Sequence, residues 1–201
     1  MKQIKLKVPT NWNDITIEQY QKFMVLVDSK KKEKQKMFEM IMLFCNVKKE
    51  DLRAFALADL EKVSSILMKL TKDDPSNIEV KRHLDFNGAK YSLLPKMSEM
   101  TTGEFVDLEN YVLEAVDNLH KIMAVLYRKQ TAEVDRWGRY NVEDYEPTPE
   151  KQEAMLKFPM GEALGVLNFF FHLEKELIVD SRNYLRKQTL SRIKEQSKSG
   201  E

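Results

Sequence analysis

The residue types that most often carry chemistry are few in this sequence. There are three histidines, His83, His120 and His172, and one cysteine, Cys45. Asp117 precedes His120 by three residues, which places a carboxylate and an imidazole one helical turn apart. A di-iron bundle needs two such pairs and further glutamates that project inward, and the chain has no second Glu-x-x-His pair. The sequence therefore predicts no metal site and no cofactor.

Nucleophilic catalysis has equally little support. Cys45 lies in an apolar stretch without a histidine or basic partner nearby in sequence, which is typical of a small core residue rather than a reactive thiolate. No phosphate-binding loop, dinucleotide fingerprint, nucleophile elbow or cysteine pair occurs. We predict that the protein is not an enzyme. A catalytic site assembled from residues far apart in the sequence is the remaining alternative.

The composition narrows the class of protein. The chain has 201 residues, of which 42% are hydrophobic and 32% charged, yet the net charge is only +1. A near-neutral balance argues against a dedicated nucleic-acid binder. No apolar run approaches the roughly 18 residues of a membrane span. A single cysteine and an N-terminus without the apolar core of a signal peptide favour a cytoplasmic location.

The fold class follows from periodicity and from the scarcity of glycine and proline, six residues each. Such a composition favours long helices over a many-turned β fold. Apolar residues at three- and four-residue spacing predict a mainly α protein. The predicted helices cover residues 15–28, 33–46, 58–70, 115–127, one segment that opens with the capping-box residues Thr101 and Glu104, one that begins near Pro149, and one that begins at Met160.

A small β element accompanies the helices. Asn87-Gly88 lies between two alternating runs and suits a tight turn with positive φ, which predicts a hairpin over about residues 80–94. The alternating "QIKLKV" of residues 3–8 predicts a short N-terminal strand, and the hairpin can extend the sheet that this strand begins. We expect one helical domain over residues 1–195 and a frayed tail over 196–201.

A long loop over residues 129–147 is the least regular stretch. It is charged and carries Trp137, Tyr140 and Tyr145, and these aromatic residues argue against plain disorder.

The stretch "GEALGVLNFFFHLEKEL", residues 161–177, is apolar almost all round a helix in its first half. A helix of this kind is normally surrounded by other elements, so we predict a central core helix. Gly161 and Gly165, four residues apart, leave a notch where another helix can approach closely. The alternative is an exposed aromatic patch for a partner, with Phe169 as its best candidate.

Several segments, in their order, resemble proteins of tailed bacteriophages. These are "ITIEQYQKF", "TTGEFVDLE", "IMAVLYRK", "YNVEDYEPTPE" and "FPMGEALGVLNFFFHLEKEL". The resemblance covers most of the chain and points to a morphogenesis protein, most like a tail assembly chaperone. One departure is Lys129, which follows Arg128 where the pattern has proline.

The resemblance implies a non-enzymatic protein that keeps the long tape-measure protein soluble while tail-tube subunits assemble around it. Holding would use a groove lined with Met, Phe and Leu that binds helical segments. The candidate partner-binding residues are Met24, Met123, Tyr127, Trp137, Tyr140 and Phe169.

Two other functions also fit the sequence. A structural virion component, such as a head–tail connector or a tail-completion ring subunit, also fits helices with a hairpin and an aromatic loop. A nucleic-acid-binding regulator would use Lys30 to Lys36 and the basic C-terminal tail, and the near-zero net charge weighs against it. The expected partners are other phage structural proteins, with neither nucleic acid nor membrane, and a homo-oligomer is left open. The expected location is the cytoplasm of the infected bacterial host or, for the alternative, the virion.

Overall fold

The computed structural model describes residues 6–72, 78–96 and 99–169, and helices dominate this part of the chain. The elements in chain order are η1 (Trp12–Asp14), α1 (Ile17–Asp28), α2 (Glu33–Phe44), α3 (Lys49–Leu52), α4 (Leu57–Lys72), β1 (His83–Phe86), β2 (Ala89–Leu93), α5 (Thr102–Val112), α6 (Leu119–Leu126), β3 (Tyr127–Lys129), α7 (Pro149–Ala154) and η4 (Met155–Lys157). A further helix covers residues 160–169. The prediction of a mainly α protein with a small β hairpin is confirmed.

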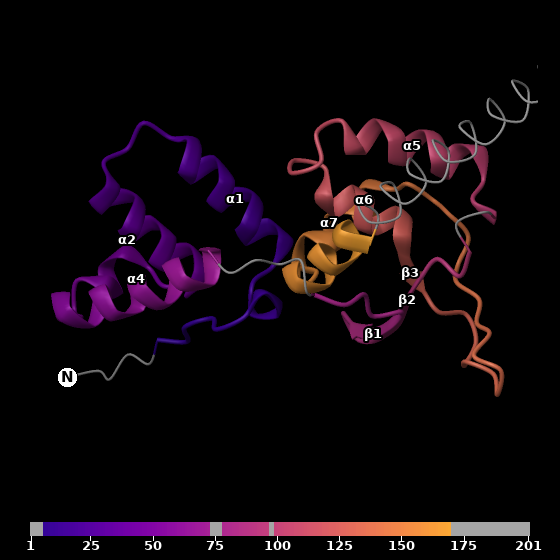
Figure 1. Cartoon of the computed structure of the whole chain (residues 1–201), viewed down its shortest axis with the longest axis horizontal. Helices are drawn as coiled ribbons and strands as arrows, with labels where there is room; N and C mark the ends of the chain where they lie inside the picture. The colour runs from indigo at the N-terminus through magenta and orange to yellow at the C-terminus, as the bar shows by residue number, and fades with distance from the viewer. Residues whose placement is uncertain (1–5, 73–77, 97–98, 170–201) are drawn as a thin grey trace, which may run out of the picture.

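The elements form two groups that lie side by side along the long axis of the molecule (Figure 1). α1, α2 and α4 make one group, and α5, α6, α7 and the sheet make the other. The chain segments at Ile15 and Phe158 connect the two groups, and the side chains of both residues are fully buried. The Ile17 amide donates to the Phe158 carbonyl at 3.0 Å, and the Met160 amide donates to the Ile15 carbonyl at 2.8 Å. One contiguous cluster of buried residues runs through both groups.

Local sequence signals set the helix starts. At α5 the Thr101 hydroxyl accepts from the Glu104 amide at 3.2 Å, and the Glu104 carboxylate accepts from the Thr101 amide, as the capping box predicts. α1 begins with the same reciprocal arrangement between Thr16 and Gln19. The predicted helix over 115–127 is shorter, because residues 113–118 form turns and the chain enters a strand at Tyr127.

The described sheet is antiparallel in the order β1-β2-β3. Asn87 and Gly88 connect β1 to β2 with φ of 53° and 75°, which is the positive-φ turn that the sequence predicts. The prediction of an N-terminal strand is wrong for the described residues of that segment. Residues 6–8 form no strand, and residues 3–5 lie outside the described segments. Leu6 and Val8 pack on the core instead, and β3 supplies the third strand.

The predicted loop over 129–147 folds back on itself. Gln130 bridges to Val142, and the Glu143 amide donates to the Lys129 carbonyl at 2.9 Å. The tip turns at Gly138, whose φ is 77°. Residues 130–148 therefore form an arm, and Figure 1 shows that its tip projects beyond the sheet. We call this segment the 130–148 arm.

The helix that begins at Met160 lies in the core over its described length. Met160, Ala163 and Val166 are fully buried, in agreement with the prediction of a central helix. Phe170, Phe171 and the tail over 196–201 lie outside the described residues. The notch at Gly161 and Gly165 is approached by Asn13 of the 3-10 helix η1 and by the irregular segment at Glu79, and not by an α-helix. A Cβ at Gly165 would meet the Glu79 carbonyl oxygen at 3.0 Å, and one at Gly161 would meet the Asn13 side chain.

Candidate partner-binding grooves

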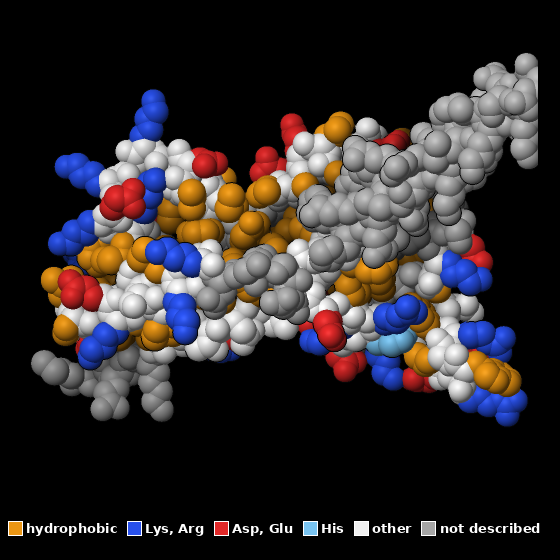
Figure 2. Space-filling view, viewed as in Figure 1, with side chains coloured by type: hydrophobic (Ala, Val, Ile, Leu, Met, Phe, Trp, Pro, Cys, Tyr) orange, Lys and Arg blue, Asp and Glu red, His pale blue; other side chains and the backbone are white. Residues whose placement is uncertain are grey.

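A large hollow in the described part of the chain lies between α1 and α4. Both helices pack on α2 and leave an open groove of about 770 Å³ between them. We call it the α1–α4 groove. It is lined by Phe23, Leu26 and Val27 of α1, by Glu33, Lys34, Lys36, Met37 and Met40 of α2, and by Leu57, Glu61, Ser64, Met68 and Thr71 of α4. Figure 2 shows hydrophobic side chains gathered between the helices of this group.

The residues that α4 contributes to this groove repeat with the spacing of a helix–helix seam. Leu57, Glu61, Ser64, Met68 and Thr71 follow one another at alternating intervals of four and three residues. Such spacing keeps side chains on one face that a second helix can pack against. At 1.5 Å per residue the stripe is about 21 Å long, which is about four helical turns. The groove therefore has the length and periodicity that suit one straight helix.

The α1–α4 groove presents apolar side chains with a balanced rim. Leu57 is 52% exposed and Met68 is 47% exposed, and both are large hydrophobic side chains. The rim carries two acidic and two basic residues, and Lys36 lies 3.9 Å from Glu33. The Lys36 ammonium also donates to the Val27 carbonyl at 2.7 Å, which ties α2 to the end of α1. Shape and apolar contact, rather than net charge, would select an occupant here.

The candidate residues named from the sequence do not line this groove. Met123 and Tyr127 are fully buried in the core and present no surface to a partner in this structure. Met24 is half-buried on α1 but is not among the lining residues. Trp137 is 63% exposed at the tip of the 130–148 arm.

Tyr140 and Phe169 are the two candidates that the fold brings together. Both line a pocket of about 390 Å³ beside β2, whose other lining residues are Val80, Arg82, Leu93, Leu94 and Pro95. The Tyr140 hydroxyl donates to the Leu93 carbonyl at 2.8 Å, and its ring meets His83 edge-on at 4.5 Å. Partial burial raises the pKa of Tyr140. These contacts hold Tyr140 as a support between the arm and the sheet.

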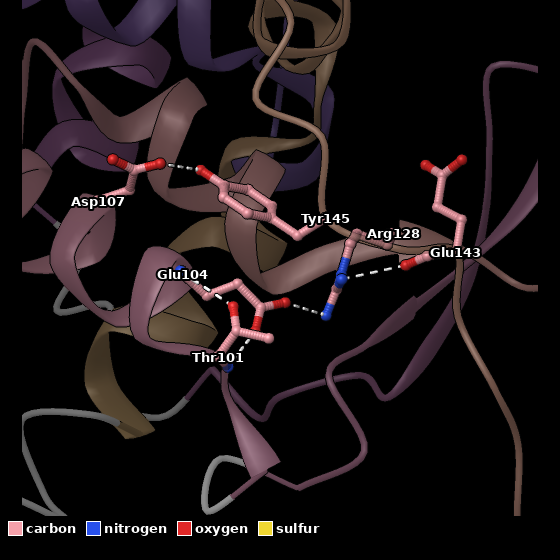
Figure 3. A network of polar contacts seen from close by, with 6 residues as sticks. All are labelled: Thr101, Glu104, Asp107, Arg128, Glu143 and Tyr145. Carbon is pink, nitrogen blue, oxygen red and sulfur yellow. Dashed lines mark hydrogen bonds and ion pairs between the residues drawn. The ribbon is translucent and has the colours of Figure 1, made fainter.

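A polar network fixes the base of the 130–148 arm (Figure 3). Arg128 and Glu104 form a buried ion pair at 2.8 Å. Arg128 also donates to the Glu143 carbonyl at 3.0 Å, and the Tyr145 hydroxyl donates to Asp107 at 2.7 Å. Burial, and next the Asp107 carboxylate, raise the pKa of Tyr145 far above its ordinary value. The Tyr145 hydroxyl therefore stays protonated near neutral pH, and the contacts to Glu104 and Asp107 anchor the arm on α5.

His83 and His120 are held in hydrogen-bonding contacts, and Cys45 is buried in the core. His83 hydrogen-bonds Ser92 at 2.8 Å, and His120 lies 3.2 Å from the Gln21 amide nitrogen. Burial lowers the pKa of His120, with a smaller contribution from Lys121. Burial raises the pKa of Cys45 to about 11, which keeps it a thiol at neutral pH. His172 lies outside the residues that the structure describes.

Comparison with known proteins returns no relative. No protein-family model, curated protein or solved structure matches the chain. Within residues 6–72, 78–96 and 99–169 no group of three His, Cys, Asp or Glu side chains is placed to hold a metal ion. No helix in these segments is long and apolar enough to cross a membrane.

Sequence reasoning missed the groove residues Val27, Leu57 and Met68. The signal for Leu57 and Met68 was present in the seam spacing of α4, but that spacing is equally typical of a stripe facing the core. Leu60, Leu67 and Leu70 form that buried stripe, while Leu57 and Met68 lie beside it and remain exposed. Which apolar residues of α4 are buried depends on where α1 and α2 end, and the sequence of α4 alone does not determine this.

Proposed function

We propose that this protein is a non-enzymatic assembly protein that holds a helical segment of another protein in the α1–α4 groove. In the terms of the sequence resemblance, it is a tail assembly chaperone of a tailed bacteriophage, and the segment belongs to the tape-measure protein. The observation that carries the proposal is the four-turn stripe of α4, from Leu57 to Thr71, which lines the groove beside the apolar side chains of α1 and α2 and exposes Leu57 and Met68 to solvent.

The size of the exposed side chains suits reversible holding. Covering the exposed halves of Val27, Leu57 and Met68 stabilises a complex by roughly 1 kcal/mol for each side chain. Association costs several kcal/mol of lost translational and rotational freedom, so such a groove binds a single helix weakly. Weak binding at each segment suits a holding protein, because the partner must be released when the tail assembles.

A substitution in the groove tests the holding site. The full chain is titrated with a dye-labelled synthetic helix of about four turns that has Leu at seam spacing and a neutral polar face. Met68→Glu places an unpaired charge against the apolar face and is expected to weaken binding roughly tenfold or more. Ile66→Glu is the matched control, because Ile66 is 44% exposed on the same helix and is not among the lining residues of the groove. Equal weakening by both variants, or no binding by the unchanged protein, contradicts the proposal.

The phage assignment has a separate test. Mass spectrometry of purified virions from the phage that encodes the chain decides between a transient and a permanent component. A chaperone is expected to be absent from the particle, abundant in infected lysate, and co-purified with a very long helical protein. Stoichiometric presence in the particle contradicts the chaperone and favours a structural subunit.

The 130–148 arm favours one second candidate, a subunit of a head–tail connector or tail-completion ring. Trp137 lies at its tip close to two guanidinium groups, whose Cζ atoms are 3.8 Å (Arg136) and 4.7 Å (Arg139) from the centroid of its ring. Asp135 accepts from Arg139 at 2.7 Å and from the Trp137 amide, which stiffens the tip. A stiff projecting aromatic tip suits contact with a neighbouring subunit. In that case Trp137→Ala abolishes ring formation in size-exclusion chromatography while the protein stays folded.

A further inference from the structure

A second groove lies on the neighbouring face of α2, and it differs from the first in charge. It has a volume of about 630 Å³ and is bounded by α2, by α3 and the turn after it, and by the start of α4. We call it the α2–α3 groove. Phe38 and Met42 of α2, Phe55 of the turn, and Leu57 and Leu60 of α4 supply most of its apolar lining.

The charged residues around the α2–α3 groove are nearly all basic. Lys32, Lys34, Lys49 and Arg53 line it, and Glu39 is its one acidic lining residue. The Glu39 carboxylate is already occupied, because Lys31 donates to one oxygen at 2.5 Å and Gln35 to the other at 3.0 Å. The hydrogen bond from Lys31 is also the main cause of the lowered pKa of Glu39.

The basic rim is only weakly neutralised within the described segments, since Lys49 helps to lower the pKa of Glu39 but forms no ion pair with it. None of the four basic residues forms an ion pair there, whereas Lys22, Lys36, Lys62 and Lys96 all do. α3 does carry Glu50 and Asp51, but neither lines the groove. An apolar floor with a basic rim that forms no ion pairs is complementary to an apolar stripe with acidic flanks.

We propose that the α2–α3 groove binds an acidic amphipathic helix of a partner protein. Its wall on α2 runs along Gln35, Phe38, Glu39 and Met42, which is the i, i+3, i+4, i+7 pattern of one helix face. From Lys32 to Met42 this wall is about 15 Å long, so the occupant is about three turns. The occupant inserts its apolar stripe between α2 and Leu57, and its Glu or Asp side chains reach Lys49 and Arg53.

A protein helix fits these observations better than a polyanion. Nucleic acid is held mainly by phosphate contacts, which would leave the apolar floor of this groove without a partner. Phe38 and Phe55 contribute to that floor and are themselves half-buried, so they are not free faces on which bases can stack. This site goes beyond the holding function proposed above, since it lies on another face of α2 and takes an occupant of defined charge. Leu57 and Lys34 line both grooves.

The test uses the full chain and a pair of dye-labelled synthetic helices. Both have Leu and Phe at i, i+3, i+4 and i+7, and their polar positions are all Glu in one and all Lys in the other. The Glu helix is expected to bind roughly tenfold more tightly at low salt, and the difference narrows as salt screens the charges. Lys49→Glu combined with Arg53→Glu is expected to reverse the preference, and Lys49→Arg combined with Arg53→Lys keeps it.

Two controls locate the binding. Lys62→Glu combined with Lys69→Glu makes the same change in net charge on exposed positions of α4 outside the groove, and is expected to leave the preference in place. Met68→Glu in the α1–α4 groove is expected to leave the Glu helix bound, so the two sites fail independently. Equal binding of both helices, equal loss in both charge-reversed variants, or full competition by a polyglutamate without apolar residues overturns the proposal.

Discussion

At the scale of single residues, the buried pair of Arg128 and Glu104 is the most consequential contact. Both side chains are almost completely buried. Each also forms a second hydrogen bond. Glu104 caps α5 through the Thr101 amide, and Arg128 holds the arm through the Glu143 carbonyl. The pair therefore links a helix start, a strand and the arm at one point.

Replacing one residue of this pair leaves the other as a buried charge without a partner. Arg128→Met leaves the Glu104 carboxylate buried without its cation, and we expect a loss of about 3–5 kcal/mol in the free energy of unfolding. Urea denaturation measures this. The double variant Arg128→Met with Glu104→Gln is expected to recover much of the loss, because the amide is neutral and keeps an oxygen for the cap. A single-variant loss below about 1 kcal/mol would show that the pair is dispensable.

At the scale of elements, the close approach of the final described helix to the segment before the hairpin depends on Gly165. A methyl group there would contact the Glu79 backbone at 3.0 Å, and backbone cannot rotate away as a side chain can. Gly165→Ala is therefore expected to destabilise the protein by about 1–3 kcal/mol, measured by thermal unfolding. The neighbouring segment must shift to admit the new side chain.

Gly103 provides the matched comparison, since it is also helical and a Cβ there meets nothing nearer than 4.0 Å. Gly103→Ala is expected to leave stability unchanged or to raise it by a few tenths of a kcal/mol, because alanine restricts the unfolded chain. If the two substitutions have the same effect, the close packing at Gly165 is not what limits that position.

At the scale of the whole molecule, the two groups of elements share one core. Trp12 lies beside the segment that joins them, and its ring meets Tyr20 edge-on at 5.9 Å. Because the buried cluster is contiguous across this join, we expect a single cooperative unfolding transition. The fluorescence of Trp12 and the far-ultraviolet circular dichroism should have the same midpoint in urea.

The variant Trp137→Phe makes this measurement specific, since Trp12 is then the one tryptophan left in the chain. Trp137 is largely exposed, so its replacement is expected to cost little. Two separate midpoints would mean that the group formed by α1, α2 and α4 unfolds independently of the other group. The contacts at Ile15 and Phe158 would then be weaker than the burial of these residues indicates.

Local signals were sufficient for much of the fold. The caps at Thr101 and Thr148, the turn at Asn87-Gly88 and most helix spans depend on residues within about four positions of one another, and such interactions form in the segment itself. The capping box and the hairpin were accordingly predicted where the structure has them.

Tertiary structure alone decided which strand completes the sheet and which apolar residues remain exposed. The edge of β2 is taken by Tyr127–Lys129 rather than by the N-terminal segment, and this choice depends on where α6 ends. Met123 and Tyr127 were candidates for a surface and are buried, while Leu57 and Met68 are exposed beside a buried stripe. Periodicity identifies the apolar face of a helix. The neighbouring elements decide how much of that face is buried. The two grooves of the α1–α4 group exist because α1, α3 and α4 leave adjacent faces of α2 uncovered, and no single segment of the sequence specifies that arrangement.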